Sequence, residues 1–342
     1  MTGKSGKLVY EGERVAVPAD EAFRAVEAVL ARAGCPDETA RIVADHLVDS
    51  GLSGVESHGV MRCLQYADQF RSGYMNPASS PIYDTDPVPI VDGRGGIGIP
   101  AMHLAAQEAV ATARRTGVAA VAIRNVGHTG RLGAYAERIA GQGCLSIIIG
   151  GGGRENWRQV APYGGRKALL PTNPYCIGMP GGLQGPVVLD FATAMIDGGW
   201  IYAARNAGAR LPEGVLIDPD GMPSTDPEDY FRGGAILPAG GPKGYAMAVL
   251  AELIGEAMLG PATTEMNWLM VVLDTTRYRS ASTIQDVAEE ILAELRDCPP
   301  APGFDRVQVP GERESDARRR ARAEGLLLPA PTWRQILDAA DG

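Results

Sequence analysis

The sequence of 342 residues contains little of what metal centres and disulfide frameworks are built from. It has four histidines and five cysteines, and the cysteines are scattered without a C-x-x-C pair. An odd number of scattered cysteines supplies neither a disulfide framework nor a zinc site, and it is typical of proteins kept in a reducing compartment. We therefore expect no metal site and a cytoplasmic location.

Positive charge and long apolar runs are also scarce. Lysine and arginine number 32 against 41 acidic residues, a net charge of −9, whereas a nucleic-acid surface requires a basic face. The single basic run, in residues 318–322, is surrounded by acidic residues and predicts a solvated helix face. No stretch approaches the roughly 18–20 apolar residues of a membrane span, and the first residues lack the apolar core of a signal peptide. We expect neither a nucleic-acid nor a membrane partner.

Hydrophobic periodicity indicates helices at the N-terminus and strands further on. Residues 18–34 and 36–51 have apolar side chains at helical spacing, and Gly34 ends the first helix. From about residue 90 the pattern changes to short apolar runs separated by helical segments, which predicts a buried sheet in α/β order. The predicted strands are residues 118–125, 145–151, 168–174, 187–193 and 267–274.

The second half also contains a long loop passage and two predicted helices. Residues 211–244 are rich in glycine and proline and are expected to cover the surface. Residues 245–260 predict an almost wholly apolar helix, which we expect to be buried rather than membrane-spanning because Glu252 and Glu256 interrupt it. Residues 283–297 predict an amphipathic helix.

Two of the four histidines lie close to other reactive side chains. The first occurs in "GVESHGVMR", which places Ser57, His58 and Arg62 within six positions. An imidazole that titrates near neutral pH and a guanidinium that holds a carboxylate through two hydrogen bonds suit a carboxylate-bearing substrate. A capping serine with a surface histidine and arginine explains the same spacing, so both interpretations stay open.

The second is His128 in "NVGHTGRLGAYAE", which follows a predicted strand and precedes a helix that begins among glycines. Ligands of open α/β sheets bind at such strand ends, and helix N-termini offer free N–H groups to phosphate. This setting favours a ligand site over a helix cap. His46 has apolar neighbours on a predicted helix, and we interpret it and His103 as structural.

Two later polar residues also occur at positions that need an explanation. Asp190 ends the apolar run "VVLD", where a buried carboxylate requires a partner, for which a histidine is a candidate. Asn173 lies between prolines in "PTNPY" and is expected to be a turn residue.

The order of these segments resembles the type-2 malate/L-lactate dehydrogenase family. The sequences of the motifs are most similar to those of the hydroxycarboxylate dehydrogenases of that family. The resemblance extends from about residue 15 to the C-terminus, and seven motifs in one order are specific although each alone is weak. It implies an NAD(P)-dependent α/β fold that is not Rossmann, with a mixed sheet flanked by helices, in a homodimer. The motifs are "GVESHGVMR", "NVGHTGRLGAYAE", "PTNP", "LDFATA", "LPEGVLIDPDGMPSTDP", "LPAGGPKGYAMA" and "VPGERE".

The resemblance also implies a division of the chain and roles for its polar residues. Residues 1–75 would form a helical part of the catalytic unit and 76–295 an α/β nucleotide-binding part, with 296–342 returning to the N-terminal part. Arg62 would bind the substrate carboxylate and His128 would be the general acid/base. Ser57, His58 and Asp190 resemble the relay of the imine-reducing relatives, and which histidine transfers the proton stays open, with His128 favoured.

The resemblance implies no metal and a nicotinamide cofactor, NAD or else NADP. Two positions depart from the family pattern: Glu56 replaces an aspartate, and Pro242, which has no N–H donor, replaces a histidine that often contacts the cofactor. The residues that would face the cofactor are His58, Gly130, Arg131, Leu132, Val188, Leu189, Asp190, Phe191, Ala192, Asn267, Gly311, Glu312, Arg313 and Glu314.

Residues 93–98, "GRGGIG", match the dinucleotide fingerprint G-x-G-x-x-G but lack its context. A Rossmann site has an acidic residue ~20 residues further on, at the end of the second strand, to hold the ribose. Here that strand ends in Asn125, and Pro100 suits the first turn of a helix, which would put the glycines before it. We therefore expect the cofactor elsewhere.

The expected function is hydride transfer between a nicotinamide cofactor and a 2-hydroxy acid/2-oxo acid pair, with one acid/base group supplied by the protein. A reductase of a cyclic imine carboxylate is the first alternative, because its substrate also presents a carboxylate beside the reducible double bond. A non-catalytic nucleotide-binding homologue is the second. The non-catalytic alternative is disfavoured because the chain contains all five polar residues of the expected site, namely Ser57, His58, Arg62, His128 and Asp190.

Overall fold

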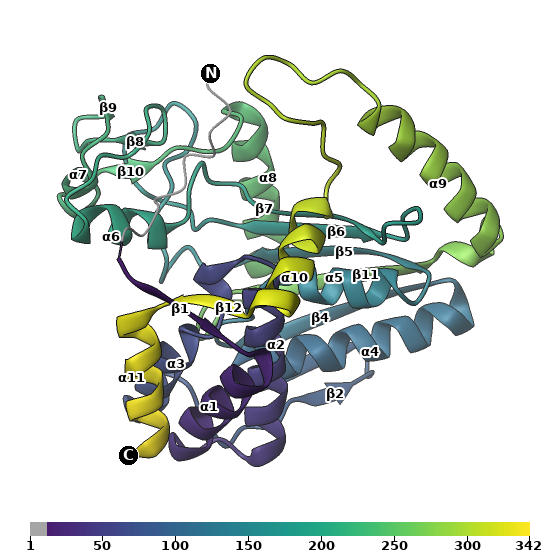
Figure 1. Ribbon diagram of the computed structural model, residues 1–342, viewed down its shortest axis with the longest axis horizontal. Coiled ribbons are helices and arrows are strands. Elements are labelled where there is room, and N and C mark those ends of the chain that lie inside the picture. The colour runs from purple at the N-terminus through teal and green to yellow at the C-terminus, as the bar shows by residue number, and fades with distance from the viewer. Residues whose placement is uncertain (1–11) are drawn as a thin grey trace.

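The computed structural model describes residues 12–342, which form an α/β fold around a seven-stranded sheet (Figure 1). Its strand order is β2-β3-β4-β11-β5-β6-β7, and β3–β4 is the parallel pair in an otherwise antiparallel sheet. The predicted mixed sheet flanked by helices is therefore confirmed. The strands are β2 (Ile82–Asp84), β3 (Ile90–Gly96), β4 (Val118–Val126), β5 (Cys144–Gly151), β6 (Pro174–Met179), β7 (Val187–Ala192) and β11 (Asn267–Asp274).

The two faces of this sheet are covered unequally. Helices α4 (Gly98–Thr116) and α5 (Leu132–Ala140) pack on one face, where Ile148 and Met270 are fully buried. Because successive strand residues point to opposite faces, Ile147 and Val271 point the other way, and they are only half-buried. That second face carries α8 (Pro242–Glu252) and the π-helical turn Leu253–Met258 that continues it.

The helix predicted at 245–260 forms, but only one of its faces is buried, which includes Ala248 and Ala251. Its apolar side chains Leu250, Leu253 and Met258 are 53%, 56% and 58% exposed, whereas Glu252 is buried. The Glu252 carboxylate accepts hydrogen bonds from the N–H groups of Gly152 and Arg154 and from the amide of Asn173. These bonds replace the hydration that burial removes, so an acidic residue can face inward while the leucines face outward.

The strand predicted at 168–174 is wrong. Leu170 makes only an isolated bridge to Val160, and the next strand, β6, begins at Pro174. Pro171 and Pro174 cannot donate to a ladder, and Asn173 between them has a φ of +38°, which a strand does not accommodate. Asn173 is therefore outside the strand as expected, but it is fully buried with its amide donating to Glu252 and lies in no assigned turn.

The two ends of the described chain meet beside the sheet. The predicted helices at 18–34 and 36–51 are confirmed as α1 (Ala19–Arg32) and α2 (Asp37–Leu52), which share a core with α3 (Arg62–Arg71). The C-terminal part returns to them: β1 (Arg14–Val17) pairs antiparallel with β12 (Leu326–Pro329), α10 (Glu312–Glu324) packs on α2, and α11 (Ala330–Asp341) packs on α1. The division at residues 75 and 295 stays a prediction.

The glycine- and proline-rich passage forms part of a small lobe with its own core around Leu216 and Ile236. Helix α9 (Ala281–Arg296) confirms the predicted amphipathic helix and lies along one side of the molecule (Figure 1). Within residues 12–342, no helix is long and apolar enough to cross a membrane, and no cluster of potential ligands could hold a metal ion. The lobe contains α6 (Gly198–Asn206), β8 (Leu216–Ile217), β9 (Pro223–Ser224), α7 (Pro227–Phe231) and β10 (Ala235–Ile236).

Candidate active site

The segment "ESH" forms a short 3-10 helix, Glu56–His58, immediately before α3. The Ser57 hydroxyl lies 3.0 Å from Nδ1 of His58, and Nε of Arg62 donates to the Ser57 carbonyl at 2.5 Å. Since α3 begins at Arg62, the turn orients this guanidinium against the serine–histidine pair. All three side chains are partly exposed, as a substrate-binding group must be.

His128 lies in the loop between β4 and α5, and its ring stacks on that of His58 with centroids 5.3 Å apart. The glycines of "GRGGIG" bring this loop into place. A Cβ on Gly93 would come within 2.3 Å of Val126, and one on Gly98 within 2.5 Å of the Gly127 carbonyl, while the Gly98 N–H donates to the His128 carbonyl. Gly98 is the first residue of α4 rather than a residue before it, which corrects the expected helix start.

Tyr66 belongs to this site, although no sequence motif pointed to it. Its hydroxyl lies 2.6 Å from Nδ1 of His128, and the N–H of Gly130 donates to the same nitrogen at 3.2 Å. Because a backbone N–H can only donate, Nδ1 is unprotonated and the neutral ring carries its proton on Nε2. The signal that was available is the i, i+4 spacing of Arg62 and Tyr66, which puts both on one face of α3.

Both histidines of the stacked pair are neutral at physiological pH. Desolvation, together with the charges of Arg62 and Arg131, lowers the pKa of His58 to about 3. Desolvation likewise holds the pKa of His128 well below its ordinary value, again with help from Arg62. A neutral imidazole with its proton on Nε2 is a hydrogen-bond donor suited to a carbonyl oxygen.

Asp190 has a different partner from the one expected. Its Oδ2 accepts a hydrogen bond from the Gly133 N–H at 2.7 Å, at the N-terminus of α5, where the helix dipole favours an anion. Desolvation raises the pKa of Asp190 even though its side chain still reaches solvent, and the Gly133 N–H and the charge of Arg131 oppose the shift. No described histidine contacts this carboxylate, so the three-residue relay with Ser57 and His58 is not formed in the structure.

The Arg131 side chain forms structural ion pairs in this fold, and its expected contact with the cofactor stays a prediction. Its side chain is 4% exposed and donates to Asp49 and to both carboxylate oxygens of Glu137. Its backbone N–H donates to Nε2 of His46, which is fully buried and structural as expected. Its neighbours Gly130 and Leu132 are also buried, and their contact with a cofactor stays a prediction.

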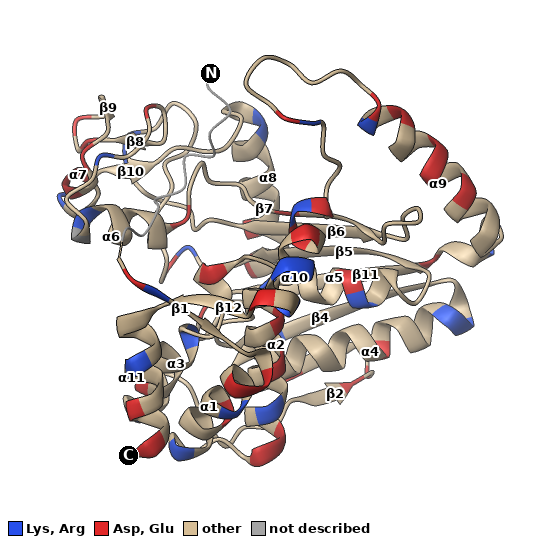
Figure 2. Cartoon of the chain, in the orientation of Figure 1, with Lys and Arg blue, Asp and Glu red and all other residues tan. Residues whose placement is uncertain are grey.

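The same buried ion pairs correct the expected solvated helix face at residues 318–322. Helix α10 carries both signs of charge (Figure 2), and the Arg318 guanidinium donates to Asp49, Ser53 and Glu137. Arg319, in contrast, is exposed, as are the two further arginines of the run. Asp49 and Glu137 therefore lie between two arginines that come from distant segments of the chain.

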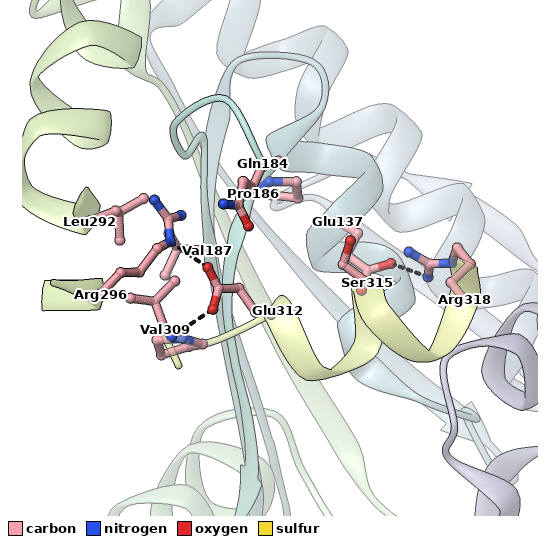
Figure 3. A pocket seen from close by; sticks show the side chains of 13 residues that line it. Glu137, Gln184, Pro186, Val187, Leu292, Arg296, Val309, Glu312, Ser315 and Arg318 are labelled. Atoms are coloured by element: carbon pink, nitrogen blue, oxygen red, sulfur yellow. Dashed lines mark hydrogen bonds and ion pairs between the residues drawn. The ribbon is translucent and has the colours of Figure 1, made fainter. Parts of the chain in front are cut away.

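A cavity of about 240 Å³ lies between the start of β7, the end of α9 and the N-terminus of α10 (Figure 3). Gly311 lines it with a φ of +97°, and a Cβ there would come within 3.0 Å of the Pro186 carbonyl. Glu312 accepts from Nε of Arg296 and from the Val309 N–H, and Arg318 points to Glu137. The cavity is also lined by Gln184, Gly185, Val187, Leu292, Pro310 and Ser315.

The remaining cofactor candidates divide into accessible and buried residues. In β7, Leu189 and Asp190 are exposed and Phe191 and Ala192 half-buried, whereas Val188 is buried beside Gly311. Arg313 and Glu314, at the start of α10, are accessible and pair with each other. Asn267 lies apart from them: it is 1% exposed and donates its amide to the carbonyls of Gly255 and Gly260. Their contacts with a cofactor stay predictions.

Residues 17–337 match the family model described as malate/L-lactate dehydrogenase. The L-sulfolactate dehydrogenase of Methanocaldococcus jannaschii is 32% identical over 90% of this chain and 91% of its own, and its solved structure superposes with a TM-score of 0.84 over 96% and 97% of the two chains. Hydroxycarboxylate dehydrogenase B of Escherichia coli is 31% identical over 92% and 91%. The Delta(1)-pyrroline-2-carboxylate/Delta(1)-piperideine-2-carboxylate reductase of Pseudomonas putida is 32% identical over 92% and 94%.

Proposed function

The chain belongs to the malate/L-lactate dehydrogenase family, which makes it a 2-hydroxy acid/2-oxo acid oxidoreductase, and we propose that a nicotinamide cofactor carries its hydride. The observation that supports the proposal is the joint placement of the Arg62 guanidinium and a tautomer-fixed histidine, His128, around the stacked His58 ring. A 2-oxo acid needs both groups, one for its carboxylate and one for the adjacent carbonyl oxygen.

In this proposal each side chain has a separate task. Arg62 holds the substrate carboxylate, and its link to the Ser57 carbonyl fixes the direction of the guanidinium. Nε2–H of His128 donates to the 2-oxo oxygen and then yields its proton as that oxygen gains charge. Solvent then returns a proton to the ring, while the Tyr66 hydroxyl, 2.6 Å from Nδ1, stays protonated and holds the ring in the orientation for the transfer.

The residues around Gly311 fit the adenosine end of a nicotinamide cofactor, which supplies the hydride when bound. The cavity there combines apolar side chains with the carboxylates of Glu137 and Glu312, which suit a sugar diol. Its two arginines, Arg296 and Arg318, are already ion-paired to those carboxylates. Among the described residues, no arginine or lysine that lines this cavity is left unpaired for an additional phosphate, so we propose NAD rather than NADP.

A combined assay tests both parts of this proposal. We expect NADH to be oxidised in the presence of a 2-oxo acid such as pyruvate, with a kcat/KM that reaches about 10⁴ M⁻¹s⁻¹ for a good substrate. In fluorescence titrations without substrate, NADPH should bind about 10-fold more weakly than NADH, a difference of ~1.4 kcal/mol. Saturable NADH binding without turnover of any 2-oxo or imine acid would instead identify a non-catalytic homologue.

Reduction of a cyclic imine carboxylate remains the second candidate, because a relative named for that reaction is 32% identical over nearly the whole chain. Its substrate would use the same arginine for its carboxylate. Comparing pyruvate with piperideine-2-carboxylate in the assay above separates the two candidates. We also infer a cytoplasmic location, which is supported by five free cysteines, one of them exposed.

Replacing Arg62 by lysine should act on substrate binding. Lysine keeps the charge but loses the two-pronged grip on a carboxylate, so we expect KM for the 2-oxo acid to rise by roughly 10- to 100-fold while kcat changes little. Steady-state kinetics with cofactor and acid varied independently measures this. The control is Arg71→Lys on the same helix, an exposed arginine paired to Asp68, which should leave both constants unchanged. An unchanged KM in Arg62→Lys would contradict the proposed role.

We further propose that the chain works as a homodimer, supported by the apolar side chains that α8 and its π-helical extension leave exposed. Sedimentation at micromolar concentration should give twice the 36.0 kDa chain mass. The double variant Leu250→Glu/Leu253→Glu should shift the protein toward the monomer, because the charges would face an apolar interface. Leu183→Glu, at an exposed leucine outside this surface, is the control and should not change the oligomeric state. A wild-type monomer would refute the proposal.

A further inference from the structure

Glu265 is an acidic residue next to the candidate site that the proposed mechanism does not use. It precedes β11, and its N–H donates at 3.4 Å to the carbonyl of Val126, two residues before His128. The preceding carbonyl, of Thr264, accepts a hydrogen bond from the Tyr74 hydroxyl at 3.2 Å. The backbone of residues 264–265 is thus attached to the end of β4, from which the loop carrying His128 starts.

The Glu265 carboxylate has no assigned partner in the described chain. It is half-buried, and no hydrogen bond or ion pair of its side chain is formed within residues 12–342. The charged and titratable groups it interacts with are Arg62, Tyr66 and Tyr74. Desolvation raises its pKa to about 7, and the charge of Arg62 opposes this only in part. A half-buried carboxylate left without a donor is a candidate for contact with a ligand.

We propose that Glu265 determines the substrate class: among the acids held by Arg62, it selects those with a cationic or hydrogen-bond-donating group near the reacting carbon and disfavours a second acid group. This inference rests on the proposed function. Once the substrate carboxylate neutralises Arg62, the charge of Glu265 is left facing two uncharged phenols, Tyr66 and Tyr74. A donor on the substrate satisfies that charge, whereas a second carboxylate meets repulsion.

Two kinds of substrate would present such a donor. One is a 2-hydroxy acid with an ammonium group on its third carbon, and the other is a cyclic imine acid, whose protonated nitrogen lies at the reacting double bond. Both share the chemistry that Glu265 recognises, and they differ in the bond that is reduced. Separate assays with each kind of substrate identify which of the two the enzyme uses.

Three 2-hydroxy acids that differ at the third carbon test the inference: in lactate this carbon is an unsubstituted methyl group, in isoserine it carries an ammonium group, and in malate it carries a carboxylate. At pH 8.5, where Glu265 is ionised, wild type should have the highest kcat/KM for isoserine and the lowest for malate. Like charges about 5 Å apart in a partly buried site repel enough to change kcat/KM by roughly 10-fold or more. Glu265→Gln keeps the shape without the charge, so it should raise malate relative to lactate by about 10-fold and lower isoserine. Glu294→Gln, at an exposed glutamate of α9, is the matched control. In the assay with the cyclic imine acid, Glu265→Gln should lower the kcat/KM of piperideine-2-carboxylate relative to that of pyruvate.

Other outcomes would overturn the inference and are distinguishable from failure of the proposed function. If wild type prefers malate to lactate and Glu265→Gln keeps that preference, Glu265 does not select substrates, although the dehydrogenase activity stands. An equal loss of kcat for all acids, with the melting temperature unchanged, would make it a proton-transfer group instead. If Glu265→Gln does not fold, the order of kcat/KM for the three acids in the wild-type protein decides whether the inference holds. If no acid is turned over, the function fails, and calorimetric binding of the three acids to the NADH complex still tests the selection.

Discussion

His128→Asn should lower kcat by roughly 10²–10⁴-fold, the usual contribution of a positioned acid/base group. The variant loses the Nε2–H that we propose donates to the substrate oxygen, and it also loses Nδ1, on which Tyr66 and Gly130 converge. Cofactor affinity should change little, because asparagine keeps a polar group at the start of the loop. Steady-state kinetics and NADH titration of the same variant separate the two effects.

The control for this prediction is His103→Asn, which removes a histidine that contacts Arg138 outside the site and should keep kcat near the wild-type value. The comparison with His58→Asn decides between the stacked histidines. Within the described part of the chain, His58 bonds to Ser57 and to no tyrosine, so its loss should affect kcat and KM together rather than abolish turnover. Near-normal kcat in His128→Asn with none in His58→Asn would show that the proton was assigned to the wrong histidine.

Local spacing was sufficient for the parts of the site that lie within one segment. Ser57, His58 and Arg62 are close in sequence, and a 3-10 turn followed by the first turn of α3 keeps them close in space. The predicted strand before His128 is likewise confirmed as β4, since its apolar, β-branched pattern indicated it directly. Such features depend on neighbours a few residues apart, and the sequence alone carries that information.

Pairings between distant segments could not be predicted in the same way. The bond of Asp190 to Gly133, the contact of Tyr66 with His128 and the position of Glu265 beside Val126 all depend on how strands and helices pack. Helix α8 illustrates the difficulty: composition indicated an apolar, buried element, but the Glu252 carboxylate finds three donors in the interior. Hydrophobicity could not reveal those donors, which come from residues about 80–100 positions away.

The ion pairs of Arg131 and Arg318 connect parts of the chain that lie far apart in the sequence. Asp49 is on α2, Glu137 on α5 and Arg318 on α10, and Arg131 lies at the N-terminal end of α5. A Cβ on Gly133 would come within 2.6 Å of Arg131 Nη1 and 3.1 Å of Asp190 Oδ2, so the ion pairs also border the candidate cofactor surface. Removing Arg131 would leave two half-buried carboxylates with Arg318 as their shared partner.

Arg131→Met should therefore lower the free energy of unfolding by about 3 kcal/mol, the lower end of the range for breaking a buried ion pair, because Arg318 still pairs both acids. Methionine preserves most of the side-chain volume, so the loss reflects charge rather than a cavity. Urea denaturation at pH 7 measures it as a shift in midpoint with an unchanged slope. Arg319→Met, which removes an arginine that is 68% exposed and paired to Asp316, should change the stability by less than about 0.5 kcal/mol. Equal effects of the two substitutions would mean that the buried ion pairs do not stabilise the junction between the N-terminal helices, α5 and the C-terminal segment.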